Sequence, residues 1–357
     1  LLILAATAAL AWAGTGLSLR NAGTWGLEDV PNERSSHTRV TPRGGGAAIV
    51  AASLAGFLLL TLAVVTLPHL VGLGQPFDQG TFASLLAQDA AWLYSLGPLV
   101  WIALPLLLAA LVLGILGLQD DREPLSIRLR LGFQLFCCAW LLVVLSSLPG
   151  AGSAWTGLKE QLWQLLSGWG LPGMSETFTQ AEARDALLTA FMTLGLVVAL
   201  MLLGTWWINL YNFMDGIDGI AASQALFMLL AGVLLRSLML AENSAGTTSG
   251  LLERLQLQFL MTDPWSVGSL IIAAATAGFL VHNWAPARIF MGDAGSLFLG
   301  FSILAVAGLD ITGHLTWLRE AQLTGETDVS AGYGIPVTSG MILGALFITD
   351  ATVTLLR

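Results

Sequence analysis

Charged residues are scarce in this sequence. Asp, Glu, Lys and Arg make up 10% of its 357 residues, whereas a soluble domain usually carries about 25%. Hydrophobic residues make up 55%, and apolar runs recur along the whole length. A run of about 20 such residues is long enough to cross a bilayer as a helix, and these runs lack the short alternating segments of a membrane β-barrel. The composition therefore predicts an all-α, polytopic integral membrane protein.

Other absences narrow the function. The only two cysteines, Cys137 and Cys138, are adjacent in an apolar run, which gives little support to a disulfide or metal role and favours packing or lipid-facing residues. The sequence has no G-x-x-x-x-G-K-[ST] motif, so ATP hydrolysis of the P-loop type is not expected. Its net charge of -9 argues against a nucleic-acid partner.

We expect nine membrane-spanning helices in a single domain that covers residues 1–357. The first run lacks the charged region and cleavage site of a signal peptide, so we interpret it as a true span. The chain begins without Met and ends at Arg357 as a span ends, so we expect both termini to be incomplete. The predicted spans are 1–19, 44–67, 96–118, 130–148, 187–208, 220–240, 265–282, 296–313 and 334–356.

The distribution of positive charge orients these spans. One face would carry nine Lys or Arg residues and the other five, so the first face is predicted to be cytoplasmic. The residues of the first face are Arg20, Arg34, Arg39, Arg43, Arg122, Arg128, Arg130, Arg288 and Arg357. Its loops fall near 20–43, 119–130, 209–219 and 283–296, and they hold the unusual polar clusters of the sequence. The opposite loops, rich in Trp, indicate an interfacial aromatic belt.

Carboxylates gather on the predicted cytoplasmic face. Five acids follow or adjoin hydrophobic spans: Asp120, Asp121, Asp215, Asp218 and Asp293. Clustered carboxylates repel one another unless a cation joins them. Oxygen ligands without thiolates favour Mg²⁺ or Mn²⁺, and Mg²⁺ commonly lies between carboxylates and substrate phosphates. We therefore expect a divalent metal and a phosphate-bearing substrate.

Basic and glycine-rich segments on the same face agree with a phosphate substrate. The arginines of these loops, Arg43 among them, offer forked donors that suit phosphate oxygens. The run Gly44, Gly45 and Gly46 opens the second span, and we expect its backbone amides to approach an anion.

Four motifs on this face resemble those of the polyprenyl-phosphate N-acetylhexosamine-1-phosphate transferases. NLYNFMDGIDG is similar to the family's N-x-x-N-x-x-D-G-x-D-G loop, NWAPARIFMGDAGS to its P-A-x-x-F-x-G-D-x-G-S loop, LGLQDDR to its G-x-x-D-D loop, and RSSHTRVTPRGGG to its first cytoplasmic loop. They occur in the family's order and cover nearly the whole chain. The segments RSSHTRVTPRGGG and FITDATVTLLR are most similar to the corresponding segments of bacterial enzymes that initiate O-antigen or other surface polysaccharides.

The resemblance implies a reaction and a location. Undecaprenyl phosphate would attack the sugar-bearing phosphate of a UDP-N-acetylamino sugar with Mg²⁺ as cofactor, which releases UMP and leaves a sugar linked to the lipid by pyrophosphate. The protein would lie in the bacterial inner membrane with its site on the cytoplasmic face. The sequence leaves open whether the chain forms a homodimer.

The resemblance also implies residue roles. Asn209, Asn212, Asp215 and Asp218 would line the nucleotide-sugar site, with Asn212 near the metal and the two aspartates near the uridine. Asp293 would bind Mg²⁺, with Gly292 leaving room for the diphosphate. Asp120 and Asp121 would bind or deprotonate the lipid phosphate. His37, Arg43 and Arg288 would contact substrate phosphate.

The sequence departs from the family pattern in two places. Pro124 occupies the third acidic position of the D-D-x-x-D motif, so a role for a third carboxylate there is doubtful. A cytoplasmic loop with a histidine motif and a last span, both implied by the resemblance, are not among these residues.

Three alternatives remain. A peptidoglycan-type phospho-MurNAc-pentapeptide translocase shares the motifs. A secondary transporter also uses intramembrane acids, but its charges should lie near the midplane and not at one face. A CDP-alcohol phosphatidyltransferase would need a D-G-x-x-A-R signature, which is absent.

Overall fold

The computed structural model describes residues 1–31, 40–71, 97–148, 150–168, 186–244 and 264–324. His37 and the predicted ninth span lie outside these ranges. The described helices are α1 (Leu2–Trp25), α2 (Gly46–Val71), α4 (Gly97–Arg122), α5 (Ile127–Ser146), α6 (Ala151–Gly168), α8 (Ala186–Met214), α9 (Ile220–Ser244), α12 (Pro264–Asn283) and α13 (Gly292–Thr324). Two short strands, β1 (Glu28–Asp29) and β2 (Thr41–Pro42), pair antiparallel.

The prediction of an all-helical, multi-pass membrane protein is confirmed. Eight of the described helices, all except α6, are long and apolar enough to cross a bilayer. Each of them coincides with one of the first eight predicted spans. In a bilayer only helices or closed barrels satisfy their backbone hydrogen bonds internally, which explains why the apolar runs of the sequence map so directly onto helices.

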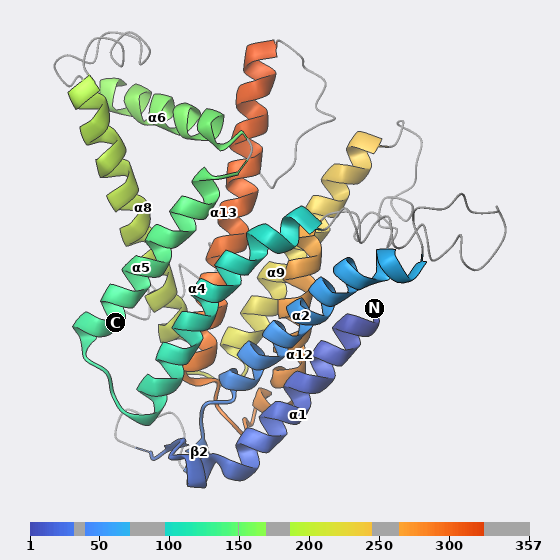
Figure 1. Ribbon diagram of the computed structural model, residues 1–357. Coiled ribbons are helices and arrows are strands. Elements are labelled where there is room, and N and C mark those ends of the chain that lie inside the picture. Colours follow the sequence, from blue (N-terminus) through green and yellow to red (C-terminus); the bar gives the residue numbers. More distant parts are fainter. Residues whose placement is uncertain (32–39, 72–96, 149, 169–185, 245–263, 325–357) are drawn as a thin grey trace.

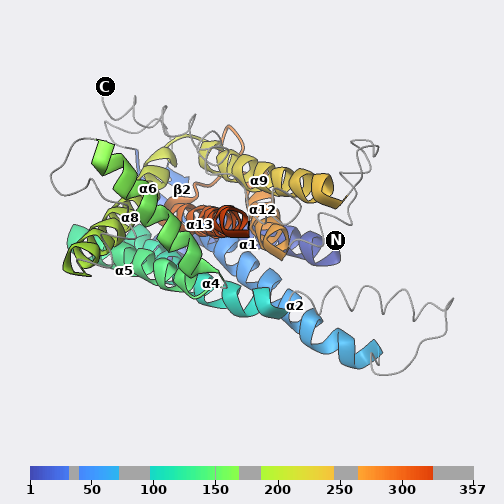
Figure 2. The same cartoon turned by 90° about the horizontal axis from the view of Figure 1, so that it is seen from above.

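Helix α13 forms the centre of the bundle (Figures 1 and 2). It packs against α2, α4, α5, α8 and α9, while α1 packs against α12 and α2 at one side. Most of the membrane-crossing part of α13 is buried, whereas α8 faces outward along most of its length. The first turn of α13 is therefore held by several other helices at the same time, and this turn carries Asp293.

Glycines allow α13 to lie very close to α2 and α4. A Cβ atom at Gly46 would lie 2.3 Å from the Cα of Gly295, and one at Gly117 would lie 2.3 Å from the backbone oxygen of Asp293. The amides of Gly45 and Gly46 donate to the carbonyls of Phe290 and Met291, at 3.0 and 2.8 Å. The expectation that these two amides approach an anion is therefore wrong, because backbone carbonyls of the loop before α13 already accept their hydrogen bonds.

The inner ends of the helices extend further than predicted. Asp120 and Asp121 lie in the last turn of α4, Asn209 and Asn212 lie on α8, and Asp293 lies in the first turn of α13. The predicted loops were therefore too long, because polar residues at the end of a span continue the helix. Side chains on a helix are held more firmly than side chains on a loop.

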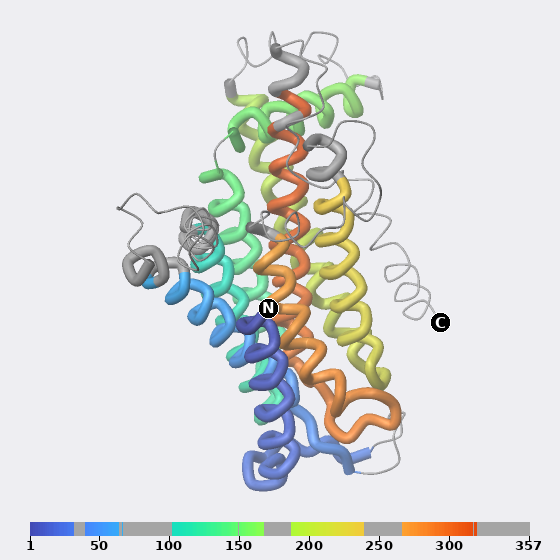
Figure 3. Tube along the Cα trace, turned by 90° about the vertical axis from the view of Figure 1, so that its right-hand side faces the viewer, coloured from blue at the N-terminus to red at the C-terminus, as the bar shows by residue number. Residues whose placement is uncertain are grey.

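Helix α6 occupies a segment that the sequence had indicated as a loop. It lies at the end of the bundle opposite to the start of α13 (Figures 1 and 3). Its Trp163 is 3% exposed and packs with Leu188 and Met192. Its Glu160 forms a two-point ion pair with Arg319 of α13, at 2.8 and 3.0 Å. The sequence did not predict α6 because this segment, with its Lys, Glu and Gln residues, is less apolar than the spanning helices.

Candidate functional site

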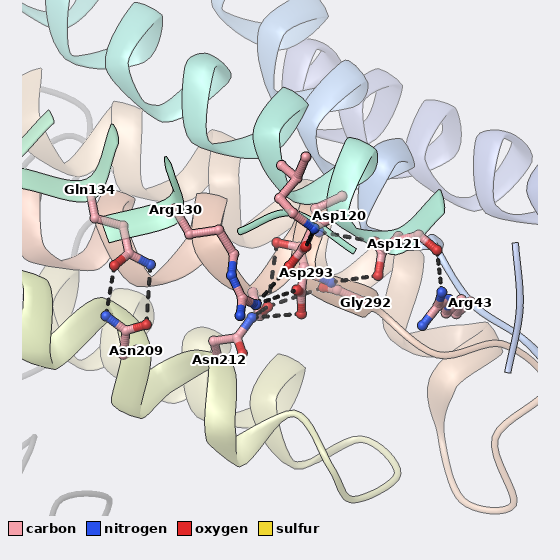
Figure 4. Close-up of polar contacts among 12 residues, drawn as sticks. Arg43, Asp120, Asp121, Arg130, Gln134, Asn209, Asn212, Gly292 and Asp293 are labelled. Carbon is pink, nitrogen blue, oxygen red and sulfur yellow. Dashed lines mark hydrogen bonds and ion pairs between the residues drawn. The ribbon is translucent and has the colours of Figure 1, made fainter. Parts of the chain in front are cut away.

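Polar side chains from four helices converge at one end of the bundle (Figure 4). The end of α4 supplies two aspartates, the start of α5 supplies an arginine, the end of α8 supplies two asparagines, and the start of α13 supplies a glycine and an aspartate. The residues are Asp120, Asp121, Arg130, Asn209, Asn212, Gly292 and Asp293. The expectation that distant polar motifs meet at one face is confirmed for these described residues.

Asp293 is the central side chain of this group. Its Oδ1 accepts a hydrogen bond of 2.8 Å from Nδ2 of Asn212, which also donates to Oγ of Ser296 at 3.0 Å. Its Oδ2 lies 3.9 Å from the Arg130 guanidinium. Asp293 thus meets an amide on one side and a cation on the other, while its side chain keeps 30% of its surface exposed. A carboxylate held in this way remains accessible to a ligand.

Asp120 lies beside Asp293 and shares its cation. Its Oδ2 accepts a hydrogen bond of 2.8 Å from Arg130, and its Oδ1 accepts one of 2.6 Å from the backbone amide of Leu125. The Asp120 side chain is 5% exposed, whereas Arg130 is 38% exposed. One arginine therefore bridges two carboxylates and still presents part of its guanidinium to solvent.

Asp121 points to the backbone at the start of α13. Its two oxygens accept hydrogen bonds from the amides of Asp293 and Ala294, at 3.1 and 3.2 Å. Arg43, which lies just before α2, donates to the backbone carbonyl of Asp121. Asp120 and Asp121 are neighbours in the sequence, yet their carboxylates have different partners.

Asp215 completes the group from the turn after α8. Its Oδ2 accepts a hydrogen bond of 3.1 Å from the amide of Gly292. The pKa of Asp215 lies well above its usual value, first because burial desolvates the carboxylate and then because Asp121 and Asp293 are close. The hydrogen bond from Gly292 lowers the pKa, but by less. Without a compensating cation, the ionised form of Asp215 is unfavourable in this place.

This unfavourable charge predicts a pH-dependent loss of stability in the metal-free protein. The carboxyl ionises at a lower pH in the unfolded chain than in the folded protein, so the fold loses stability as the pH rises above about 4. The variant Asp215→Asn removes the charge and keeps an oxygen for Gly292. We expect it to melt a few degrees above the parent in EDTA at about pH 7, with no difference near pH 4. An unchanged or lower melting temperature at neutral pH would contradict the burial penalty.

A pair of amides joins α5 to α8 beside the carboxylates (Figure 4). Gln134 Nε2 donates to Oδ1 of Asn209 at 3.2 Å, and Asn209 Nδ2 donates to Oε1 of Gln134 at 2.7 Å. Asn209 Nδ2 also donates to the backbone oxygen of Thr205. Gln134 follows Arg130 by one turn of α5, and Asn209 precedes Asn212 by one turn of α8. The amide pair therefore aligns the two helices whose side chains reach Asp293.

A double-mutant cycle tests this amide pair. Interhelical hydrogen bonds in membranes contribute about 0.6 kcal/mol each, so the two bonds predict a coupling of about 1 kcal/mol between Gln134→Ala and Asn209→Ala. The measurement is reversible unfolding in detergent of the parent, the two single variants and the double variant. If the two single effects simply add, the side chains do not support each other and the described pairing is wrong.

The remaining predicted residues lie beside the group or outside the described ranges. Asp218 Oδ2 accepts a hydrogen bond of 2.9 Å from the amide of Ala287. Arg288 is exposed, and its backbone amide donates to the carbonyl of His282. A hollow of about 460 Å³ lies beside Asp218 and is lined in part by Gln224 and Trp284. His37 lies outside the described residues.

Sequence reasoning missed some contributors to this site. Gln134 was not predicted, because a single Gln inside an apolar span has no motif around it. Asn283 was not predicted either, although its Oδ1 accepts from the amide of Gly219 and its Nδ2 donates to the carbonyl of Ile289. Its position as the first residue of the NWAPARIFMGDAGS motif was the available signal. Arg130 was considered only as one of several basic residues.

The donor set fits a divalent cation that is held only partly by protein. Within the described ranges, no three acidic, histidine or cysteine side chains converge as a closed metal cage requires. The group instead offers the accessible Asp293 carboxylate, the Asn212 amide and further carboxylates close by. Mg²⁺ is commonly bound through one or two carboxylates together with substrate phosphates and water. The residues present fit that mode.

A protein-family model, described as glycosyl transferase family 4, matches residues 103–310. The chain belongs to glycosyl transferase family 4. The match begins in α4 and ends in α13, so it includes the four clustered aspartates, Asp120, Asp121, Asp215 and Asp293. This result agrees with the family resemblance that the four motifs had indicated.

Individual relatives in this family come from bacteria. The chain is 29% identical to a decaprenyl-phosphate N-acetylglucosaminephosphotransferase of Mycobacterium tuberculosis over 310 residues, which covers 87% of this chain and 59% of that relative. It is 31% identical to a phospho-N-acetylmuramoyl-pentapeptide-transferase of Mycolicibacterium smegmatis over 339 residues, which covers 91% of this chain and 72% of that relative. The chain thus spans less than two thirds of the length of the first of these relatives.

Proposed function

We propose that this protein transfers an N-acetylamino-sugar 1-phosphate from a UDP-sugar to a polyprenyl phosphate. The observation that carries the proposal is the meeting of Asp120, Asp215 and Asp293 with Asn212 and Arg130 at one end of a membrane bundle. The donor carries a negatively charged diphosphate, and the acceptor carries a long apolar tail. A site at the ends of the membrane spans suits both, because polar side chains there adjoin the apolar surfaces of the helices. The sugar attached in this way would initiate a surface polysaccharide such as O-antigen.

The reaction requires one displacement at phosphorus. An oxygen of the acceptor phosphate forms a bond to the sugar-bearing phosphorus of the UDP-sugar, the bond from that phosphorus to the bridging oxygen breaks, and UMP leaves with the electron pair. The second ionisation of a phosphate monoester lies near pKa 6, so the acceptor is largely ionised at neutral pH. Positioning and neutralisation of charge then supply most of the catalysis.

Each residue of the group has a place in this proposal. Asp293 and Asn212 would hold Mg²⁺. The space expected beside Gly292 for the diphosphate is filled by the Asp121 carboxylate, which a Cβ atom at Gly292 would approach to 2.6 Å. Mg²⁺, when bound, would neutralise charge on the diphosphate; Mn²⁺ has similar ligand preferences. Asp120 and Arg130 face the acceptor phosphate, while Asp215 and Asp218 face the uridine nucleotide. Arg43, Arg288 and His37 remain proposed phosphate contacts, and Asn209 supports the nucleotide-sugar site through its bond to Gln134.

An apolar pocket supports a lipid acceptor. It has a volume of about 200 Å³ and lies between α5, α6, α8 and α13. Cys138, Leu203 and Leu304 are among its walls. Helices α5, α8 and α13 are the same helices whose inner ends carry Arg130, Asn212 and Asp293. The pocket lies toward the α6 end of these helices, so a prenyl chain whose phosphate lies beside Asp293 would reach it only after extending along α13.

A second donor class has specific support. The relatives include phospho-N-acetylmuramoyl-pentapeptide-transferases, so a UDP-muramoyl-peptide is the alternative donor.

We also propose that the site faces the cytoplasm of a bacterium from its inner membrane, since the arginine excess lies on that side. The family match disfavours the secondary-transporter alternative. The comparisons give no support to the homodimer that the sequence left open.

The experiment is a transfer assay in detergent. The purified protein is mixed with Mg²⁺, a polyprenyl phosphate of decaprenyl or undecaprenyl length, and a panel of donors. The panel contains UDP-GlcNAc, its 6-deoxy relatives and UDP-MurNAc-pentapeptide, and mass spectrometry identifies the lipid product and UMP. We expect one N-acetylhexosamine donor to give a lipid pyrophosphate sugar. A product from UDP-MurNAc-pentapeptide alone would establish the alternative, and no product from any donor with folded protein would contradict the proposed reaction.

A further inference from the structure

The two adjacent aspartates of α4 face different parts of the site. Asp120 bonds to Arg130, whose guanidinium also lies near Asp293. The Asp121 side chain faces the backbone that opens α13 (Figure 4). A shared role at the acceptor phosphate, which the sequence had indicated for both, does not follow from these different surroundings.

The partners of Asp121 are backbone amides that the start of a helix leaves unsatisfied. The first amides of an α-helix have no acceptor within the helix, and a side chain just before the helix usually caps them. Met291, just before α13, has no side-chain oxygen to do so, and Gly292, the first residue of the helix, has no side chain. Asp121 accepts from the amides of Asp293 and Ala294 although 172 residues separate it from Asp293. Its negative charge also lies at the positive end of the helix dipole.

The surrounding atoms leave Asp121 little freedom. The residue is 3% exposed, and a Cβ atom at Gly292 would come within 2.6 Å of its carboxylate. One turn earlier, Gly117 brings the backbone of α4 against the backbone of Asp293. Arg43 donates to the Asp121 carbonyl, and its positive charge is near the Asp121 carboxylate. The carboxylate is therefore compensated by a cation and two amides, and is enclosed on the side where α13 begins.

We infer that Asp121 is a positioning residue, which caps α13 from α4 and thereby fixes the carboxylate of Asp293. The inference rests on the proposed function, because Asp293 is there the proposed metal ligand. The amide of Asp293 and its carboxylate belong to the same residue, so loss of the bond to the amide displaces the carboxylate. Asp120, whose side chain is 5% exposed, instead holds Arg130. The adjacent aspartates thus position different groups of the site: Asp121 the start of α13 and Asp120 the guanidinium that would meet the acceptor phosphate.

Amide hydrogen exchange tests the capping directly. Peptides that cover the start of α13 are compared in the parent, Asp121→Asn and Asp120→Asn proteins, all in detergent and checked for folding by thermal unfolding. Asparagine keeps one acceptor but turns a donor toward the second amide. We expect faster exchange at residues 293 and 294 in Asp121→Asn and parent-like exchange in Asp120→Asn. Parent-like exchange in a folded Asp121→Asn protein would overturn the inference.

A second readout separates positioning from proton transfer. In the transfer assay, Asp121→Asn should raise the Mg²⁺ concentration for half-maximal rate by about 10-fold or more, as loss of a supporting residue does at metal sites. The pH profile of its remaining activity should keep the parent's shape. An unchanged Mg²⁺ requirement with an altered pH profile would make Asp121 a base and overturn the inference.

A conservative variant covers the case in which Asp121→Asn fails to fold. Asp121→Glu keeps the charge and both acceptor oxygens. Its extra methylene meets the enclosed surroundings, so we expect a lower melting temperature than in the parent but partial protection at residues 293 and 294. Exchange as fast as in an uncapped helix end would contradict the inference. If no donor supports transfer by the parent protein, the proposed function fails, whereas the exchange experiment still decides whether Asp121 caps α13.

Discussion

The variant Asp293→Asn is expected to lose at least about 100-fold of the transfer rate, the scale on which removal of one electrostatic group lowers catalysis. Asp293 has an accessible carboxylate between the Asn212 amide and the Arg130 cation. An amide in its place can still meet Asn212, but it brings no negative charge to a divalent cation. The measurement is the transfer rate as a function of Mg²⁺ concentration. The residual rate should show little dependence on Mg²⁺.

The matched control for Asp293→Asn is Glu123→Gln. Glu123 lies just after α4 on the same face, but its side chain is exposed. It also lies next to Pro124, at the place where the sequence departs from the family's acidic motif. We expect Glu123→Gln to transfer sugar phosphate like the parent protein. If Asp293→Asn keeps both its rate and its Mg²⁺ dependence, Asp293 is not the metal ligand and the proposed site is wrong.

The variant Gly117→Ala is expected to damage both the fold and the activity. The added methyl group would lie 2.3 Å from the backbone oxygen of Asp293 and 2.6 Å from the amide nitrogen of Ala294. These are backbone atoms, so no side-chain rotation relieves the contact and α13 has to move away from α4. Overpacking of this kind costs about 1–3 kcal/mol. A displacement of about 1 Å at the site can lower the rate about 100-fold.

Thermal unfolding and the transfer assay measure the two effects of Gly117→Ala. Gly132→Ala is the control, because it adds the same methyl group to α5, where the new atom would meet no described atom within 4 Å. A helix gains about 1 kcal/mol from Gly→Ala where nothing obstructs it, so the control should be as stable as the parent or more stable. Full activity and stability in Gly117→Ala would contradict the close approach of α4 and α13.

Much of this fold could be predicted because a membrane restricts what a sequence can do. An apolar run of about 20 residues has few alternatives to a spanning helix, and alternation of the spans places distant motifs at one face. In this way the sequence alone predicted that Asp120, Asn212, Asp215 and Asp293 gather together. The same reasoning could not show which atom bonds to which, since that depends on the rotation and closeness of helices.

The features that sequence reasoning missed depend on contacts between distant residues. The amide pair of Gln134 and Asn209 requires a particular rotation of α5 against α8. The capping of α13 by Asp121 joins residues that are 172 positions apart. The glycines before α2 were interpreted by analogy with anion-binding turns, yet their amides bond to the loop before α13. In each case the sequence contained the residue or its motif, but it could not show which distant group would form the hydrogen bond.

The central claim is that Asp293, in the first turn of α13, binds the divalent cation of a nucleotide-sugar transferase. Crystals of the protein grown with Mn²⁺ and UMP, measured at a wavelength where Mn²⁺ scatters anomalously, test it most directly. We expect an anomalous peak at bonding distance, about 2.1–2.2 Å, from an Asp293 carboxylate oxygen and close to the UMP phosphate. A peak at another place in the protein, or bound UMP without a peak beside Asp293, would contradict the account.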